Sequence, residues 1–288
     1  MIRKNIDFFK NIDTEEKAYW CGFLLADGNL TSPTQKRKQS KYINLYLAEK
    51  DKEHAEKFAN IFDKKIKKII NKNKKNNKEF STYGISLGSK EMWKDLINIG
   101  IVFKKSLKPN IKIFNFINEN LMHHFIRGYF DGDGCITYSV KNKYKEGIVN
   151  IKGSEVFCKK IQNIITKNLG LPKTKIFKTK NIFNLQIHGN CQLIKFKNWI
   201  YNNSTIFLKR KKDLFETLQT NVGKGSSKYR GVSFRKVNQK WEVSLVWKNK
   251  KYSLGSYLLE KDAAKAYNKK ALELNVPKYW INILEEEL

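Results

Sequence analysis

The sequence is poor in acidic residues. Its 288 residues include 27 Asp and Glu against 57 Lys and Arg, which gives a formal net charge of +30. A Lys-rich codon bias would account for many of the lysines, but it does not explain why acids are so few. An excess of positive charge on this scale indicates a polyanionic partner, because neutralising phosphates releases counterions and drives binding.

Cysteine and histidine are also scarce, with four of each. Cys21, Cys135, Cys158 and Cys191 have no C-x-x-C spacing, so neither a disulfide framework nor a structural zinc site is indicated. The sequence contains no signal-type apolar segment near residue 1 and no apolar run of membrane-spanning length. We expect a soluble intracellular protein with no membrane partner, in a bacterial or phage-infected cytoplasm or an organelle matrix.

One phrase occurs twice in the chain. Trp20–Gly28 reads WCGFLLADG and Ile126–Gly134 reads IRGYFDGDG, and their closing aspartates, Asp27 and Asp133, are 106 residues apart. A phrase repeated at the spacing of a domain predicts two similar halves. Each half then contributes one carboxylate from the same structural position.

Both phrases are typical of buried helices that end near an Asp-Gly pair. Gly22 and Gly128 lie in the middle of these helices, where glycine is a poor helix former. The compensation that we expect is a close approach of the two helix backbones. The two glycines are therefore predicted to be helix-packing residues.

The similarity continues beyond the helices, which predicts two α+β halves at residues 1–106 and 107–218. Each half continues as strand, helix, strand and helix, with expected strands at Ile43–Leu47, Tyr83–Leu87, Ile148–Ile151 and Phe183–Ile187. Each half also ends in a basic cluster. Asp27 and Lys104 are 77 residues apart, and Asp133 and Lys209 are 76 apart.

The composition changes at a polar, Gly- and Ser-containing linker, residues 219–227. Three short β-prone runs follow, and then a helical pattern at Glu260–Asn275 with alanines at helical spacing. Residues 228–288 are therefore predicted to form a small separate domain of three strands and one helix.

The matched aspartates indicate a metal site. A carboxylate at the C-terminal end of a helix is disfavoured by the helix dipole, and a divalent cation would compensate for this. We expect two or more Mg²⁺ ions at Asp27 and Asp133, with the adjacent Ala26 and Gly132 completing the site. Lys104 and Lys209 are candidate catalytic cations, with Lys105 and Arg210 as near alternatives.

The Asp-Gly pairs also have other interpretations. A single Asp-Gly is commonly a turn or a cap, but the matched pair with matched lysines favours a functional role. An EF-hand beginning at Asp131 fails, because Asn142 stands where the closing glutamate belongs. Leu25 occupies the position equivalent to Asp131, so Asp131 is predicted to be structural or to support the site.

These repeats resemble the LAGLIDADG homing endonucleases, whose name is the helix motif that both phrases match over roughly residues 10–218. The resemblance implies a pseudo-twofold pair of αββαββα halves whose antiparallel sheets form a saddle on duplex DNA. It also implies that the last acid of each motif, here Asp27 and Asp133, binds the catalytic metal. Trp20-Cys21 and Ile126-Arg127 depart from the Leu-Ala of the motif.

The C-terminal module is similar to the APETALA/ethylene-response-factor type of DNA-binding domain. Tyr229-Arg230-Gly231-Val232, Trp241, Leu254-Gly255 and Ala263–Tyr267 carry this similarity over about fifty residues. The resemblance implies DNA contacts from Arg230 and Arg235, and more weakly from Trp241 and Lys251. Packing in the core is an equally good reading for Trp241. Ser233 and Ser253 depart from the Arg and Trp that are usual in that family.

The function expected from the sequence is a monomeric, Mg²⁺-dependent, site-specific endonuclease for double-stranded DNA, encoded by a mobile element such as a homing intron. Polar strand residues are the candidates for base contacts: Asn44, Tyr46, Ser86, Asn150, Lys152, Asn184 and Gln186. The alternative is a non-catalytic protein of the same fold, either an RNA maturase or a DNA-binding regulator. Because relatives with those roles often lose a motif acid, the presence of both acids favours the enzyme.

Overall fold

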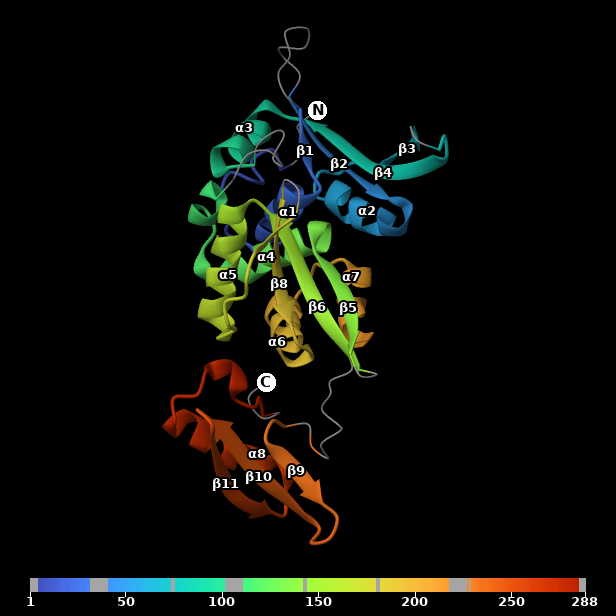
Figure 1. The fold of residues 1–288 in the computed structure, drawn as a ribbon. Helices are drawn as coiled ribbons and strands as arrows, with labels where there is room; N and C mark the ends of the chain where they lie inside the picture. The colour runs from blue at the N-terminus through green and yellow to red at the C-terminus, as the bar shows by residue number, and fades with distance from the viewer. Residues whose placement is uncertain are drawn as a thin grey trace.

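The computed structural model describes residues 5–31, 41–73, 76–101, 111–141, 144–179, 182–217, 227 and 229–284 (Figure 1). The first half contains α1 (Glu15–Ala26), β1 (Asn29–Leu30), β2 (Tyr42–Ala48), α2 (Lys52–Asn60), β3 (Lys67–Lys72), β4 (Glu79–Gly88) and α3 (Lys90–Ile99). The second contains α4 (Met122–Asp133), β5 (Cys135–Lys141), β6 (Tyr144–Gly153), α5 (Glu155–Leu169), β7 (Phe177–Thr179), β8 (Ile182–His188), α6 (Asn190–Tyr201) and α7 (Lys209–Leu214). The C-terminal part contains β9 (Val232–Arg235), β10 (Lys240–Trp247), β11 (Lys250–Tyr257) and α8 (Glu260–Glu273).

The two halves have the same sheet topology. One antiparallel sheet has the order β1-β2-β4-β3 and the other has the order β5-β6-β8-β7. Their registers also correspond: Asn29 pairs with Asn44 and Asn44 with Ser86, just as Cys135 pairs with Asn150 and Asn150 with Gln186. The predicted α+β class, with a repeated half, is confirmed.

Each sheet buries one face under helices and leaves the other face open. In β2 the buried side chains are Ile43, Leu45 and Leu47, and they alternate with the partly exposed Asn44 and Tyr46. This period of two is the pattern of a strand with one face in the core. Helices α2 and α3 pack on the first sheet, and α5 and α6 pack on the second (Figure 1).

The central helices α1 and α4 pack against each other with their backbones in contact. A Cβ atom built on Gly22 would lie 2.0 Å from the carbonyl oxygen of Phe125, and one on Gly128 would lie 1.9 Å from that of Tyr19. Such distances exclude any side chain, so both positions need glycine. The two contacts are equivalent by the repeat, which makes this seam the axis that relates the two halves.

The C-terminal part has a hydrophobic core of its own. The sheet β11-β10-β9 packs on α8 through Val243 and Leu245 on the strand side, and through Ala264, Tyr267 and Ala271 on the helix side. Nearly all of the expected linker, residues 219–227, lies outside the described residues. Among the described residues, no helix is both long and apolar enough to cross a membrane.

Candidate active site

The C-terminal ends of α1 and α4 bring Asp27 and Asp133 to the same end of the helix pair, where both residues are exposed. A Cβ built on Gly132 would lie 2.4 Å from the Cβ of Ala26 and 3.5 Å from Oδ2 of Asp27. Burial raises the pKa of Tyr129, and the negative charges of Asp133 and Asp27 both raise it further. Both carboxylates therefore lie within electrostatic reach of one tyrosine.

The donor set suits a hard cation. Asp27 and Asp133 offer carboxylate oxygens, and the described residues contain no group of three or more His, Cys, Asp or Glu side chains that could hold a metal ion by themselves. Mg²⁺ keeps several waters and is commonly bound by one or two carboxylates together with substrate phosphates. Two exposed carboxylates at adjacent helix ends fit this way of binding and do not fit a closed structural site.

Of the two predicted catalytic lysines, the structure describes one. Lys104 is outside the described residues. Lys209 begins α7, is 82% exposed, and forms an ion pair with Asp213 at 2.6 Å. Its ammonium group is therefore engaged one helical turn further along α7 rather than directed at the two aspartates.

Lys211 is the buried lysine of α7, and the sequence analysis did not select it as a candidate. It is 7% exposed, and its ammonium group donates to the carbonyl oxygen of Gly134. Burial and the charge of Arg210 lower the pKa of Lys211, whereas the carboxylates of Asp131 and Asp27 act in the opposite direction. A buried cation thus lies beside the end of α4, within the field of Asp27.

Arg210 links the second half to the first. Its guanidinium group makes two hydrogen bonds to Asp51, at 2.6 and 2.7 Å, and Asp51 is 7% exposed. These bonds raise the pKa of Arg210, and the carboxylates of Asp131 and Asp27 add to the effect. Paired, two-point bonds of this kind fix a guanidinium group in orientation as well as in place.

Asp131 is fully buried behind the two exposed aspartates. Its carboxylate accepts hydrogen bonds from the hydroxyls of Tyr19 and Tyr201 and from the backbone N–H of Leu208. Burial raises the pKa of Asp131 to about 6, although these hydrogen bonds favour the charged form. Its position agrees with the expectation of a structural or supporting residue.

The polar candidates for base contacts all lie on the open faces of the two sheets. In the first sheet, Ser86 donates to Asn44 at 2.6 Å and lies 3.1 Å from the hydroxyl of Tyr46. In the second, the side-chain amides of Asn184 and Gln186 both donate to Asn150, which is 6% exposed. Lys152 is exposed on the same face. Asn150 is the buried centre of its network, and its neighbours present the outward groups.

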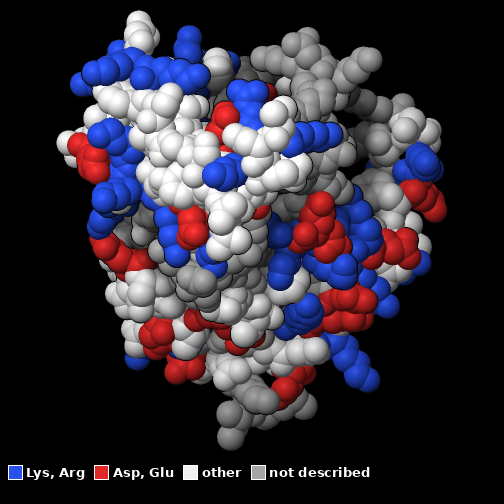
Figure 2. Space-filling model, turned by 90° about the horizontal axis from the view of Figure 1, so that it is seen from below, with Lys and Arg blue, Asp and Glu red and all other residues white. Residues whose placement is uncertain are grey.

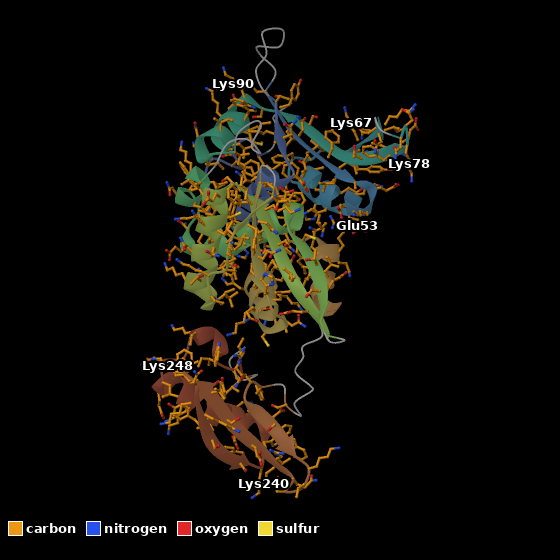
Figure 3. The ribbon with its side chains drawn as sticks, in the orientation of Figure 1. Glu53, Lys67, Lys78, Lys90, Lys240 and Lys248 are labelled. Atoms are coloured by element: carbon orange, nitrogen blue, oxygen red, sulfur yellow. The ribbon has the colours of Figure 1, made fainter. Side chains whose placement is uncertain are left out.

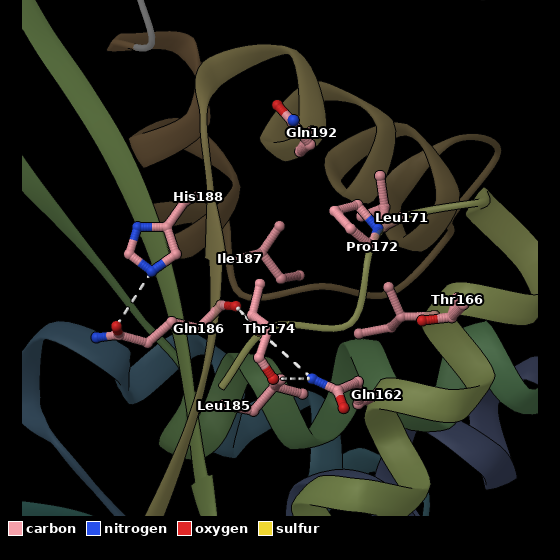
Figure 4. Close-up of a pocket in the computed structure, with 11 residues that line it drawn as sticks. Gln162, Thr166, Leu171, Pro172, Thr174, Leu185, Gln186, Ile187, His188 and Gln192 are labelled. Carbon is pink, nitrogen blue, oxygen red and sulfur yellow. Dashed lines mark hydrogen bonds between the residues drawn. The ribbon is translucent and has the colours of Figure 1, made fainter. Parts of the chain in front are cut away.

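A small cavity lies beside the second sheet. It has a volume of about 160 Å³ and lies between α5, the 171–174 segment, β8 and the start of α6 (Figure 4). Its wall carries Gln162, which donates to the carbonyl oxygen of Thr174, and His188, which lies 3.2 Å from the side-chain oxygen of Gln186. The cavity is close to the base-contact candidate Gln186 and away from the aspartates.

The four candidate DNA-contact residues of the C-terminal part do not share one face of its sheet. Arg235 and Lys251 lie on the face opposite α8, where Arg235 forms an ion pair with Glu242 at 2.8 Å. Trp241 lies on the helix side, with its ring centroid 4.9 Å from that of Phe234. Arg230 lies over the ring of Trp280 at 4.6 Å.

Lysines also lie at the ends of strands in other parts of the chain. Figure 3 labels Lys240 near the end of the C-terminal sheet, and Lys67 and Lys78 near the strands β3 and β4 of the first half.

Basic side chains are unevenly distributed over the surface. In Figure 2, which views the molecule from below, Lys and Arg gather toward the upper edge, whereas acids lie among them in the middle and lower parts. With a net charge of +30, such an arrangement favours approach of a polyanion from particular sides.

Residues 120–201, in the second half, match the family model of the LAGLIDADG-like domain. Among solved structures, the chain is similar to the homing endonuclease I-WcaI bound to its DNA recognition sequence, with a TM-score of 0.51, 18% identity, and coverage of 72% of this chain and 90% of that chain. It also matches mesophilic variants of the homing endonuclease I-DmoI, with a TM-score of 0.48, 16% identity, and coverage of 74% and 100%. No curated protein matches the chain. At this identity the likeness to I-WcaI shows the fold alone.

Proposed function

We propose that the protein is a site-specific endonuclease for double-stranded DNA that acts as a monomer, with its two halves as a pseudo-dimer. The observation that carries this proposal is the position of Asp27 and Asp133. They lie at the ends of two helices packed backbone to backbone, and the charges of Lys211 and Arg210, both from α7, interact with that of Asp27. Two carboxylates related by a pseudo-twofold axis suit hydrolysis of two phosphodiester bonds related by the same axis.

In this proposal Asp27 and Asp133, with Ala26 and Gly132 next to them, hold Mg²⁺ ions, which supply Lewis-acid stabilisation of the phosphate charge when bound. The buried ammonium of Lys211 stabilises the negative charge that develops on the phosphate. Arg210 adds positive charge at an orientation fixed by Asp51. Lys104 remains a candidate for the same role in the first half.

Duplex DNA is the proposed substrate because two similar polar sheet faces stand at equivalent positions around the site. The faces combine amide, hydroxyl and ammonium groups, which are the groups that read base edges in the major groove. A DNA complex of the structurally similar I-WcaI supports this choice. We propose that the domain at 228–288 adds DNA contacts, and that the protein serves the homing of a mobile element.

The test is cleavage of a DNA duplex with the sequence of the protein's own genomic locus without the inserted mobile element. The reaction is run with and without Mg²⁺. Asp27→Asn and Asp133→Asn should each lower the rate of cutting at least about 100-fold while leaving duplex binding within a few-fold of the original, because neither removes a sheet contact. Asp213→Asn, which changes an exposed carboxylate of α7, is the matched control and should cut normally.

Normal cutting by both aspartate variants would refute the metal assignment. Binding of DNA or RNA without any cutting by the unmodified protein would instead support the non-catalytic maturase or regulator.

A further inference from the structure

The segment 204–208, which leads into α7, is held by charged side chains of the two central helices. Glu15, at the start of α1, accepts hydrogen bonds from the backbone N–H groups of Thr205 at 2.9 Å and Ile206 at 3.4 Å. Arg127, in α4 and fully buried, donates to the carbonyl oxygens of Ile200 at 2.7 Å and Ile206 at 2.9 Å. Glu15 and Arg127 also form an ion pair at 2.6 Å.

Asp131 makes the last of these bonds. Its Oδ2 atom accepts the N–H of Leu208 at 2.7 Å, and Leu208 is the residue immediately before α7. Arg210 and Lys211 follow within one turn of that helix. The same α4 that carries Asp133 therefore fixes the point from which the two cations project.

The two α4 side chains that make these bonds, Arg127 and Asp131, have no equivalent in α1. At the repeat offset of 106 residues, Arg127 corresponds to Cys21 and Asp131 corresponds to Leu25. Cys21 and Leu25 are both buried in the hydrophobic core, and burial raises the pKa of the Cys21 thiol. Neither side chain can replace a guanidinium group or a carboxylate as an anchor. The repeat of α1 and α4 is thus broken at the two α4 residues that hold the segment leading into α7.

We propose that Asp131, which has no acidic counterpart in α1, is a positioning residue for Arg210 and Lys211, and that the two strand cleavages therefore depend on it unequally. The inference rests on the proposed nuclease function. Asp131 acts through the Leu208 N–H and so sets where the cations stand relative to one scissile phosphate. Since displacement by about 1 Å can slow an enzyme about 100-fold, loosening this bond slows one strand selectively.

The test is a cleavage time course on supercoiled plasmid and on a duplex labelled on each strand, with the full chain and Mg²⁺. Asp131→Asn keeps the shape of the side chain but weakens acceptance from Leu208. It should slow one strand about 10- to 100-fold and the other less than about threefold, so that nicked plasmid accumulates. Tyr201→Phe is the control, since it removes another hydrogen bond to Asp131 but leaves the Leu208 bond, and it should keep the original ratio of the two rates.

Asp51→Asn supplies a second variant if Asp131→Asn does not fold, because it releases Arg210 on the exposed side of α7. It should slow the same strand. Equal slowing of both strands by Asp131→Asn, or the same change of ratio in Tyr201→Phe, would show that Asp131 only stabilises the fold. If the unmodified protein fails to cut at all, the proposed function fails first, and the two failures remain distinguishable.

Discussion

At the scale of single residues, polar groups are buried where the two halves meet. His54 is 3% exposed, lies 2.8 Å from the hydroxyl of Tyr19, and packs on the rings of Trp20 and Phe23. Burial and the charge of Lys57 lower the pKa of His54 to about 3, Asp51 acts against this and Arg210 adds to it. His54 is therefore neutral in the folded protein at any pH at which a nuclease would be used.

This buried histidine predicts a loss of stability in acid. The unfolded chain takes up a proton near pH 6.5, whereas the folded chain does so only near pH 3. The stability contributed by His54 is therefore complete above pH 6.5 and is lost as the pH falls toward 3. Between pH 7 and pH 5 the loss is about 2 kcal/mol in the free energy of unfolding.

Asp131 has the opposite effect on the free energy of unfolding. Because its pKa is raised in the folded chain, its protonation stabilises the fold as the pH falls. Chemical denaturation should therefore compare the unmodified protein with His54→Gln at both pH values. The difference between their changes in unfolding free energy should be about 2 kcal/mol, and identical changes would contradict the assignment of a buried, neutral His54.

At the scale of elements, the packing of α1 on α4 decides how the site is assembled. Gly128→Ala should destabilise the fold by about 3 kcal/mol or more, because the new methyl group meets the backbone oxygen of Tyr19, which cannot move without shifting α1. Gly88→Ala is the matched control. Its methyl group would lie 3.0 Å from the partly exposed ring of Tyr42, which can turn away.

Urea denaturation followed by circular dichroism measures both changes. A Gly128→Ala protein as stable as Gly88→Ala would mean that the helices do not approach as closely as the structure shows.

The arrangement of these elements follows from the repeat, but the side chains of the site do so only in part. The phrase at Asp27 and Asp133 predicts two helices, two halves and two acids at one end, since a repeated sequence folds to a repeated unit. Lys209 and Lys211 cannot be distinguished by pattern, because Leu208 is followed by four consecutive cations. Which of the two ammonium groups is buried depends on which side of α7 packs against the protein.

Long-range pairs were also beyond prediction. Arg210 and Asp51 are 159 residues apart, in different halves, and no periodicity links them.

At the scale of the whole molecule, the excess positive charge extends to the C-terminal sheet. The face opposite α8 presents Lys240, Lys251 and Arg235, together with the short side chains of Ser233, Ser244 and Ser253. Because Arg235 is already paired with Glu242, the ammonium groups are the more available cations on this face. Point charges around a surface of short side chains favour contact with phosphates over base reading.

The combined substitution Lys240→Gln and Lys251→Gln should therefore weaken DNA binding without changing the cleavage site. If each lysine contacts one phosphate, the slope of log affinity against log salt should fall by about 2, since each contact contributes about 0.9. The measurement is fluorescence anisotropy with the specific duplex and with one whose flanking sequence is scrambled, at several salt concentrations.

Lys265→Gln with Lys269→Gln is the control. It removes the same charge from the exposed side of α8 and should leave the slope nearly unchanged. An equal fall in both double variants would mean that total charge, rather than this sheet face, governs binding. A loss confined to one flanking sequence would mean that the domain reads bases.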